Sequence, residues 1–170
     1  MISPAPAREW KNAMDVEIQE ADLADPAHAE ALRLLVDEYA RLPIAQGAPL
    51  APRVLRDLVP GLRKHPGTLA FLAWLEGRAV GVAVCFLGFS TFSARPLINI
   101  HDLAVTADCR GLGVGRRLLE AVEAKARVLG CGKVTLEVRE DNVAARRLYR
   151  RLGFGDSEGR PATLFLSKRL

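Results

Sequence analysis

The sequence predicts an α/β fold with a mixed, mostly antiparallel sheet. Two apolar strands, "TLAFLAWL" and "AVGVAVCFLGF", are separated only by "EGR", which is typical of a tight hairpin. Further along, a strand, a helix and a second strand follow one another, and such a crossover makes a parallel strand pair. The 170 residues are 49% hydrophobic and 26% charged, which suits one compact domain with a full core.

The first half of the chain begins with a short strand, expected at residues 16–19 in the alternating "DVEIQEAD". The segment "DPAHAEALRLLVDEYARLP" predicts a helix, because Asp25 can cap its N-terminus and Pro26 suits its first turn. A second helix, in "APRVLRDLVPGLRKHPG", is expected to be interrupted or to end near Pro60 and Gly61. Strands are then expected at residues 68–75, 79–89 and 97–105.

The second half opens on a glycine-rich loop that leads into a helix with apolar residues on one face. The β-branched segment "KVTLEV" (residues 133–138) predicts a strand, and "NVAARRLYRRLGF" predicts a short helix that ends at Gly153. A final strand is expected in "ATLFLSKRL", residues 162–170. We expect residues 1–14 to be a flexible lead-in and residues 15–170 to form a single domain.

Composition argues against a secreted, membrane-spanning, zinc-stabilised or disulfide-bonded protein. The N-terminus lacks the continuous apolar core of a signal peptide, and the longest apolar run, residues 80–89, is about half the length needed to cross a bilayer. We therefore expect a soluble, cytoplasmic protein without a membrane partner. The cysteines Cys85, Cys109 and Cys131 form no CxxC pair, so neither structural zinc nor a disulfide is implied.

Charge is distributed unevenly along the chain. Residues 1–109 hold 10 Lys/Arg and 13 Asp/Glu, a net charge of −3, whereas residues 110–170 hold 14 and 7, a net charge of +7. The basic second half indicates an anionic partner: a nucleic acid, an acidic protein or a phosphorylated cofactor. Only 6% of the residues are aromatic, and basic and aromatic residues do not interleave, which disfavours stacking on nucleic-acid bases.

The glycine-rich loop lies between a predicted strand and a predicted helix. The first turn of a helix has unpaired N–H groups that suit phosphate, and glycine lets an anion approach the backbone. A Walker A loop requires Gly-Lys-Ser/Thr, but Arg116 and Arg117 follow Gly115; the dinucleotide fingerprint requires glycine where Arg116 stands. The pattern Arg110-x-x-Gly113-x-Gly115 fits instead the Arg/Gln-x-x-Gly-x-Gly/Ala pyrophosphate loop of acetyl-CoA enzymes. The alternative is a glycine-rich turn that binds nothing.

Two further segments complete a family pattern. The segment "INIHDLAV" precedes the loop and "LEVREDNVAARRLYRRLGF" follows it. Together with the loop, these segments resemble the GCN5-related N-acetyltransferase (GNAT) family, over residues 67–154. The resemblance implies a twisted mixed sheet of six to seven strands with helices on both faces. Its fourth and fifth strands, here residues 97–105 and 133–138, would splay apart around the cofactor. The resemblance also implies acetyl-CoA as co-substrate and no metal. Dimers are common in the family, so a homodimer is one assembly that the resemblance allows.

The resemblance assigns cofactor contacts around that cleft. The end of the fourth strand would pair with pantetheine through the backbones of Leu103, Ala104 and Val105, and the Val105 N–H would donate to the thioester oxygen. The loop would hold the pyrophosphate with residues 110–116, namely Arg110, Gly111, Leu112, Gly113, Val114, Gly115 and Arg116.

Three residues of the last predicted helix share one face. Asn142 and Tyr149 are seven positions apart, which is two helical turns. The resemblance makes Asn142 a pantetheine contact and Tyr149 the acid that protonates the CoA thiolate. Arg146, on the same side, would reach a CoA phosphate. Without the resemblance, the sequence favours Tyr149 as a core tyrosine, and Asn142 is also expected to cap the helix.

His101 and Asp102 are two polar residues inside an otherwise apolar strand, where burial is costly without hydrogen bonds. Beside a cofactor cleft they are candidates to receive the proton of an amine, directly or through water, and Glu137 is a weaker third candidate. Residues 89–105 also resemble diamine and polyamine acetyltransferases, which carry two adjacent acids where this chain has His101 and Asp102. This difference weakens the attraction for a dication. The alternative is a hydrogen-bonded pair without a catalytic role.

These observations predict an acetyl-CoA-dependent N-acetyltransferase that acts on the primary amine of a small molecule or peptide by direct attack on the thioester. The alternatives are a non-catalytic acetyl-CoA sensor and a basic nucleic-acid-binding domain. The acceptor is expected to enter over residues 39–46 and residues 89–95.

Overall fold

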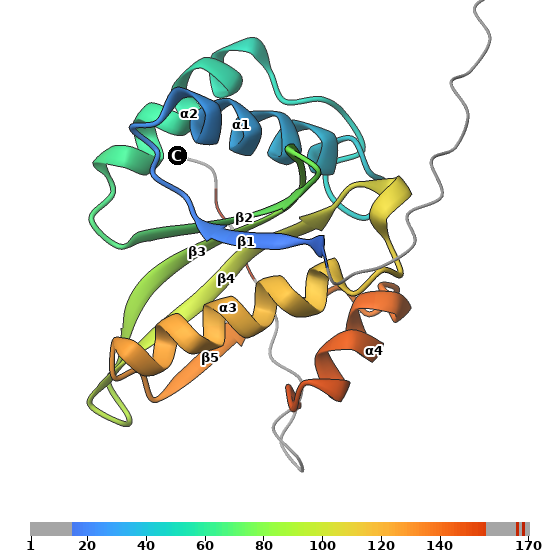
Figure 1. The fold of residues 1–170 in the computed structure, drawn as a ribbon. Coiled ribbons are helices and arrows are strands. Elements are labelled where there is room, and N and C mark those ends of the chain that lie inside the picture. The colour runs from blue at the N-terminus through green and yellow to red at the C-terminus, as the bar shows by residue number, and fades with distance from the viewer. Residues whose placement is uncertain (1–14, 156–165, 167, 169–170) are drawn as a thin grey trace, which may run out of the picture. The chain divides into compact units, whose positions relative to one another are not determined.

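The computed structural model describes residues 15–155, 166 and 168 (Figure 1). The chain divides into two compact units, one up to Glu137 and one from Val138 onward, and each is described by itself. The second unit contains α4 (Val143–Arg151). The first contains, in chain order, β1 (Glu17–Glu20), α1 (Pro26–Ala40), α2 (Pro52–Lys64), β2 (Thr68–Leu75), β3 (Arg78–Ser90), β4 (Arg95–Val105), the 3₁₀ helix η2 (Ala107–Cys109), α3 (Val114–Val128) and β5 (Lys133–Leu136). The single domain expected over residues 15–170 stays a prediction.

The first unit is built on one mixed sheet with the strand order β1-β2-β3-β4-β5. Strands β1 to β4 pair antiparallel and β4 pairs parallel with β5, which confirms the predicted mixed, mostly antiparallel architecture. The strand count is lower than predicted, because the described residues form a five-stranded sheet rather than one of six to seven strands. The expected strand at residues 162–170 lies outside the described residues, except for Leu166 and Lys168, which are not in a strand.

Helices cover both faces of this sheet, as predicted (Figure 1). On one face, α1 and α2 close a core of aliphatic side chains that includes Leu32, Leu35, Leu72, Val82 and Val84. On the other face, α3 approaches β3 closely: a Cβ on Gly81 would lie 3.1 Å from Leu118 Cδ1. Each fully buried aliphatic side chain contributes about 1.5–3 kcal/mol, so the two-sided core holds β3 and β4 in place for the site.

The helix ends follow the sequence signals with one exception. Asp25 caps α1 as predicted, because its Oδ1 accepts a hydrogen bond from the Ala27 N–H at 2.7 Å. The prediction that α2 breaks near Pro60 is wrong, since α2 continues to Lys64 with Pro60 inside it. Pro60 removes the donor for the Arg56 carbonyl, but both residues are exposed, so water can replace it. Within the described residues, no helix is long and apolar enough to cross a membrane.

The predicted hairpin in "EGR" is confirmed. Leu75 pairs with Arg78 across a two-residue turn formed by Glu76 and Gly77. Both turn residues have positive φ, 49° and 74°, as a tight turn between twisted antiparallel strands requires. Gly77 suits this conformation, and Glu76 adopts it at some cost in backbone strain.

Candidate active site

The glycine-rich loop connects β4 to α3. Strand β4 ends at Val105, η2 makes one turn, and α3 begins at Val114 with Gly113 as its N-cap. Gly111 and Gly113 adopt left-handed backbone conformations, with φ of 80° and 83°, which favour glycine. The N–H groups of the first turn of α3 have no helical acceptor, and a Cβ on Gly111 would meet nothing within 4 Å. This open cradle of backbone N–H groups fits a pyrophosphate.

Two arginines of the loop are held by neighbouring groups. Arg110 donates from Nε to the Val105 carbonyl oxygen at 3.1 Å, so its side chain lies against the end of β4. Arg116 pairs with Glu120 on the next turn of α3, with a distance of 2.7 Å between Nε and Oε1. Because Glu120 offsets part of the Arg116 charge, the backbone N–H groups are the stronger determinant of anion binding at the loop.

The turn before the loop is tied to β3 by a contact that sequence reasoning missed. Arg78 at the start of β3 donates from Nη2 to Asp108 Oδ2 at 2.6 Å and to Cys109 Sγ at 3.3 Å. Cys109 is fully buried, which makes it a packing residue. No local motif could reveal the ion pair, because its partners are 30 positions apart in the chain.

Strand β4 extends beyond its pairing with β5. The parallel ladder ends where Ile100 lies opposite Leu136, whereas β4 continues to Val105. The predicted splaying of the fourth and fifth strands is therefore confirmed. The expectation that the fifth strand reaches Val138 is wrong, because residues of β4 after Ile100 have no partner on β5 to extend the ladder. Among the described residues of the first unit, this edge of β4 has no strand partner after Ile100, and we call it the open edge.

Hydrogen-bond alternation shows which peptide groups face this open edge. The Thr106 N–H donates to the Val80 carbonyl oxygen of β3 at 2.9 Å. Because peptide groups in an antiparallel pair alternate in direction, those of Ala104 also face β3, and those of Leu103 and Val105 face away. Of the three backbone positions predicted for pantetheine, Leu103 therefore presents its N–H and C=O groups to the open edge. Val105 presents its N–H there, while its carbonyl oxygen accepts the hydrogen bond from Arg110 Nε at 3.1 Å. An extended ligand can add there as a strand.

A β-bulge in β4 positions His101 and Asp102 beside the open edge. Asp102 lies opposite Val84, and the register shifts by one residue at this point, which leaves His101 as the extra residue. Val84 belongs to the core beneath α1, so Asp102 lies on that face of the sheet. His101 packs edge-on against Phe86, which contacts the same core, with 5.7 Å between ring centroids. The bulge therefore turns both polar side chains to the face covered by α1.

Asp102 is the more buried member of this pair. Its side chain is 29% exposed and that of His101 is 65% exposed, with 3.5 Å between His101 Nδ1 and Asp102 Oδ2. Burial raises the pKa of Asp102, and His101 opposes only part of the rise. A carboxylate whose pKa is raised accepts a proton more readily than an ordinary aspartate, which is the property that a general base needs.

Tyr39 and Cys85 also respond to the charge of Asp102. Burial, followed by that charge, raises the pKa of Tyr39, so the last turn of α1 lies near Asp102. Sequence reasoning gave Tyr39 no role beyond its place in the acceptor segment, and only the fold brings it to β4. Burial, with Asp102 again as the second cause, raises the pKa of the Cys85 thiol to about 12, which keeps it protonated and unreactive.

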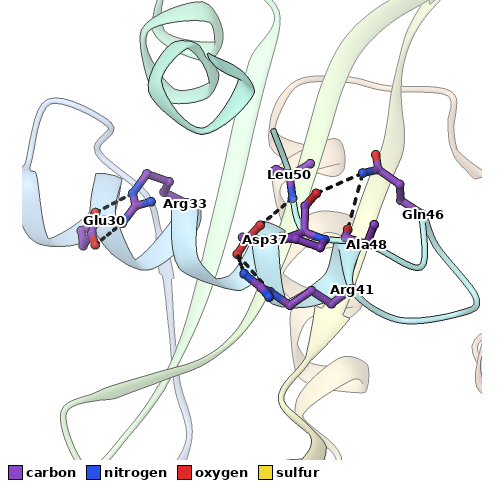
Figure 2. Close-up of polar contacts among 8 residues, drawn as sticks. Glu30, Arg33, Asp37, Arg41, Gln46, Ala48 and Leu50 are labelled. Carbon is purple, nitrogen blue, oxygen red and sulfur yellow. Dashed lines mark hydrogen bonds and ion pairs between the residues drawn. The ribbon is translucent and has the colours of Figure 1, made fainter. Parts of the chain in front are cut away.

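The loop after α1 is folded onto the end of that helix (Figure 2). Asp37 accepts hydrogen bonds from the Leu50 N–H and from the Arg41 guanidinium, both at 2.7 Å. Gln46 closes the loop further along, where its Nε2 donates to the Ala48 carbonyl oxygen at 3.5 Å. The expected acceptor entry at residues 39–46 is thus an ordered loop that begins beside Tyr39.

The other expected entry, residues 89–95, lies at the far end of the sheet (Figure 1). Arg95 begins β4 and Val105 ends it, and a strand of 11 residues is about 36 Å long at about 3.3 Å per residue. The β3–β4 hairpin therefore lies at the opposite end of β4 from the glycine loop. Phe89 and Phe92 of this hairpin are exposed, and the entry of the acceptor over residues 89–95 stays a prediction.

In the second unit, Asn142 caps α4. Its Oδ1 accepts a hydrogen bond from the Ala145 N–H at 3.2 Å, as expected for this position. Gly153 follows the helix with a φ of 85°, which confirms the predicted helix end. The cap fixes the start of α4 and leaves the amide nitrogen of Asn142 available for other contacts.

The other two predicted residues of α4 make local contacts. Arg146 donates from Nη1 to the Glu140 carbonyl oxygen at 3.0 Å, so its side chain folds back along the start of the helix. The Tyr149 ring contacts the Phe154 ring, with centroids 5.9 Å apart. Their roles toward the cofactor, and that of Asn142, stay predictions.

Glu137, the third candidate base, follows β5 and is exposed. Unlike Asp102, it is not held by a strand ladder, which makes it the weaker candidate for a positioned base. In the part of the chain that the structure describes, no group of three or more His, Cys, Asp or Glu residues could hold a metal ion.

A strand edge without a partner, beside a helix that begins in a glycine-rich turn, is typical of α/β proteins that bind an extended, phosphorylated cofactor. The model of the Acetyltransferase (GNAT) family matches residues 29–154, which is well over half of the chain. The chain belongs to this family.

Relatives and solved structures agree with this assignment. An uncharacterized N-acetyltransferase of Methanocaldococcus jannaschii is 35% identical over 108 residues, which cover 58% of this chain and 65% of the relative. The N-alpha-acetyltransferase RimI of Mycobacterium tuberculosis is 39% identical over 83 residues, 48% of this chain and 51% of the relative. The chain thus spans less than two thirds of the length of either relative in these matches. The aminoglycoside N-acetyltransferase AAC(6')-Iy, solved in complex with CoA, shares the fold with a TM-score of 0.71 and 19% identity, over 99% of this chain and 100% of that chain.

Proposed function

We propose that the chain is an N-acetyltransferase that moves the acetyl group of acetyl-CoA to a primary amine of a small molecule or peptide. The observation that carries this proposal is the open edge of β4 leading to the glycine-rich loop at the start of α3. In the transfer, the amine nitrogen bonds to the acetyl carbon and the carbon–sulfur bond breaks. The amine loses a proton and the CoA sulfur gains one.

Backbone groups of this chain would hold the cofactor. The first-turn N–H groups of α3 and the left-handed Gly111 and Gly113 suit the pyrophosphate. The N–H and C=O groups of Leu103 and the N–H of Val105 suit the pantetheine arm, which would lie along β4 as an added strand. We propose the Val105 N–H as the donor that stabilises negative charge on the acetyl oxygen, a role whose loss costs about 10²–10³ in rate.

Side chains would move the protons. We propose that Asp102 receives the proton of the amine, directly or through His101 or water, because burial raises its pKa toward the working range of a base. Tyr149 is the proposed acid for the departing thiolate. A phenol and a thiol have ordinary pKa values of about 10 and 8.5, so this transfer is feasible without a strong perturbation.

The test is the release of free thiol from acetyl-CoA in the presence of a panel of amines. We expect thiol to appear only when an amine is added, together with an equal amount of the acetylated amine by mass spectrometry. A protein that binds acetyl-CoA and releases no thiol with any amine would instead be a sensor. Stronger binding of nucleic acid than of CoA, lost at high salt, would support the nucleic-acid alternative.

A further inference from the structure

Asp102 has no fixed counter-charge in the described part of the chain. Its one charged contact there is His101 at 3.5 Å, which is an ion pair only when the imidazole is protonated, and no Lys or Arg pairs with it. A carboxylate that is largely removed from water is costly unless a cation or hydrogen-bond donors accompany it. The site therefore favours a ligand that brings a positive charge to Asp102.

A row of three rings leads away from this carboxylate. The ring row consists of His101 on β4, Phe86 on β3 and His65 at the C-terminus of α2, with 5.7 Å and 4.9 Å between successive centroids. Both contacts are edge-to-face, at 89° and 71°, a favourable geometry for aromatic pairs. His65 Nδ1 accepts a hydrogen bond from the Gly67 N–H at 3.2 Å, which fixes its ring.

The ring row is accessible at both ends. His65 and His101 are exposed and Phe86 is half-buried between them. A flat apolar group can therefore pack on the row. Asp102 follows His101 in the chain and lies at the end of the row that His101 forms. A molecule with an amine and a ring joined by a short alkyl spacer can reach both features at once.

Resting on the proposed function, we propose that the acetyl acceptor is a primary amine with one positive charge and an aromatic or flat apolar substituent. The ammonium group pairs with Asp102, and the substituent packs on the ring row of His65, Phe86 and His101.

The same groups disfavour polyamines and aminoglycosides. The ring row and the adjacent Asp102 together offer one carboxylate and two histidines. The histidines repel further positive charge when they are protonated. Asp37, on the same helix as Tyr39, is already engaged by Arg41 and the Leu50 N–H. A second ammonium group would thus have to be desolvated without a partner.

The first arm of the test compares 2-phenylethylamine, n-butylamine and spermidine in the thiol-release assay at saturating acetyl-CoA. We expect kcat/KM for 2-phenylethylamine to exceed that for n-butylamine about tenfold, and spermidine to be the poorest substrate. Equal values for the first two amines, or spermidine as the best substrate, would overturn the assignment.

The second arm removes a ring while preserving apolar volume. Phe86→Leu should raise KM for 2-phenylethylamine about tenfold, a larger rise than for n-butylamine, and leave the Kd for acetyl-CoA unchanged. His28→Ala is the matched control, because His28 contacts Trp74 at 5.9 Å on β2, two strands away from β4. His65→Ala, an exposed position, gives the same readout if Phe86→Leu does not fold. An unchanged KM for 2-phenylethylamine in a folded ring-row variant contradicts the proposal.

Failure of the proposed function gives a different pattern. If no amine releases thiol, both the transferase activity and the acceptor class are overturned. If spermidine or an aminoglycoside is acetylated best, the transferase stands and only the acceptor class is wrong.

Discussion

Asp37 and Asp102 are two half-buried carboxyl groups of the same unit that have opposite environments. The Asp37 side chain is 13% exposed and has two partners from its own chain, the Arg41 guanidinium and the Leu50 N–H (Figure 2). The Asp102 side chain is 29% exposed and contacts only His101 among charged groups of the described residues. The hydrogen bonds from Arg41 and Leu50 lower the pKa of Asp37, whereas burial raises the pKa of Asp102. Asp37 thus stabilises a loop, and Asp102 remains available for a ligand and a proton.

The largest expected effect is the loss of activity when Asp102 cannot take a proton. Asp102→Asn should lower kcat/KM for the amine about 10²–10⁴-fold, the usual contribution of a general base, and leave the Kd for acetyl-CoA unchanged. Asp37→Asn is the matched control and should change kcat/KM only slightly. Steady-state kinetics with both variants measures the contrast, and an equal loss in the two variants would refute it.

For the departing thiolate, Tyr149→Phe should lower kcat by no more than about 10²–10⁴-fold, because a thiolate leaves readily without full protonation. Binding of acetyl-CoA, measured separately by calorimetry, should be unaffected. A fully active Tyr149→Phe variant would remove this residue from the mechanism and leave the role to water.

For the free energy of unfolding, the order should be the reverse of that for activity: the loss of Asp37 should cost more than the loss of Asp102. Asp37→Ala leaves the Leu50 N–H and the Arg41 guanidinium without their acceptor, and we expect a loss of about 1–2 kcal/mol in the free energy of unfolding, since water can partly replace it. Asp37→Asn should lose less, because its amide oxygen can still accept from Leu50. Asp102→Asn should be neutral or stabilising at pH 7. Urea unfolding checks all three, and a large loss for Asp102→Asn would show that its charge is structural.

The smallest expected effect concerns the pH dependence of stability. The contributions of Asp37 and Asp102 to it should have opposite signs. The lowered pKa of Asp37 stabilises the fold above the ordinary value of about 3.9, and this contribution is lost as the pH falls through the folded pKa. The raised pKa of Asp102 stabilises the fold below that value, and this contribution is lost as the pH rises through the folded pKa.

As the pH rises, the stability of the wild type should therefore rise relative to Asp37→Asn at and below the ordinary carboxyl value of about 3.9, and fall relative to Asp102→Asn above it. Urea midpoints at several pH values measure both differences. Parallel curves for the two variants would contradict the assigned environments.

Local signals predicted the elements well. Asp25 caps α1, Glu76 and Gly77 form the hairpin turn, and the glycine-rich loop opens α3, because each feature depends on residues close in sequence. Pro60 shows the limit of such rules. Its cost depends on whether water reaches the freed Arg56 carbonyl, and that depends on the tertiary structure rather than on the helix.

The site could be predicted only in part for the same reason. The glycine pattern and the polar pair are visible in the sequence, but the bulge that turns both polar side chains to one face arises from the pairing of β3 with β4. The proximity of Tyr39 to Asp102 and the Arg78–Asp108 ion pair join segments far apart in the chain. No periodicity or spacing carries that information.

The central claim is that the glycine-rich loop binds acetyl-CoA. Isothermal titration calorimetry with a matched pair of variants tests it most directly. NAD and ATP are titrated beside acetyl-CoA. Gly111→Ala and Gly77→Ala incur similar strain, because the glycines have φ of 80° and 74° and open space around the added methyl group. Only Gly111 lies in the loop. We predict that acetyl-CoA alone binds tightly, that Gly111→Ala raises its Kd about tenfold or more, and that Gly77→Ala leaves it unchanged. No binding of acetyl-CoA, or the same Kd for both variants, would contradict the account.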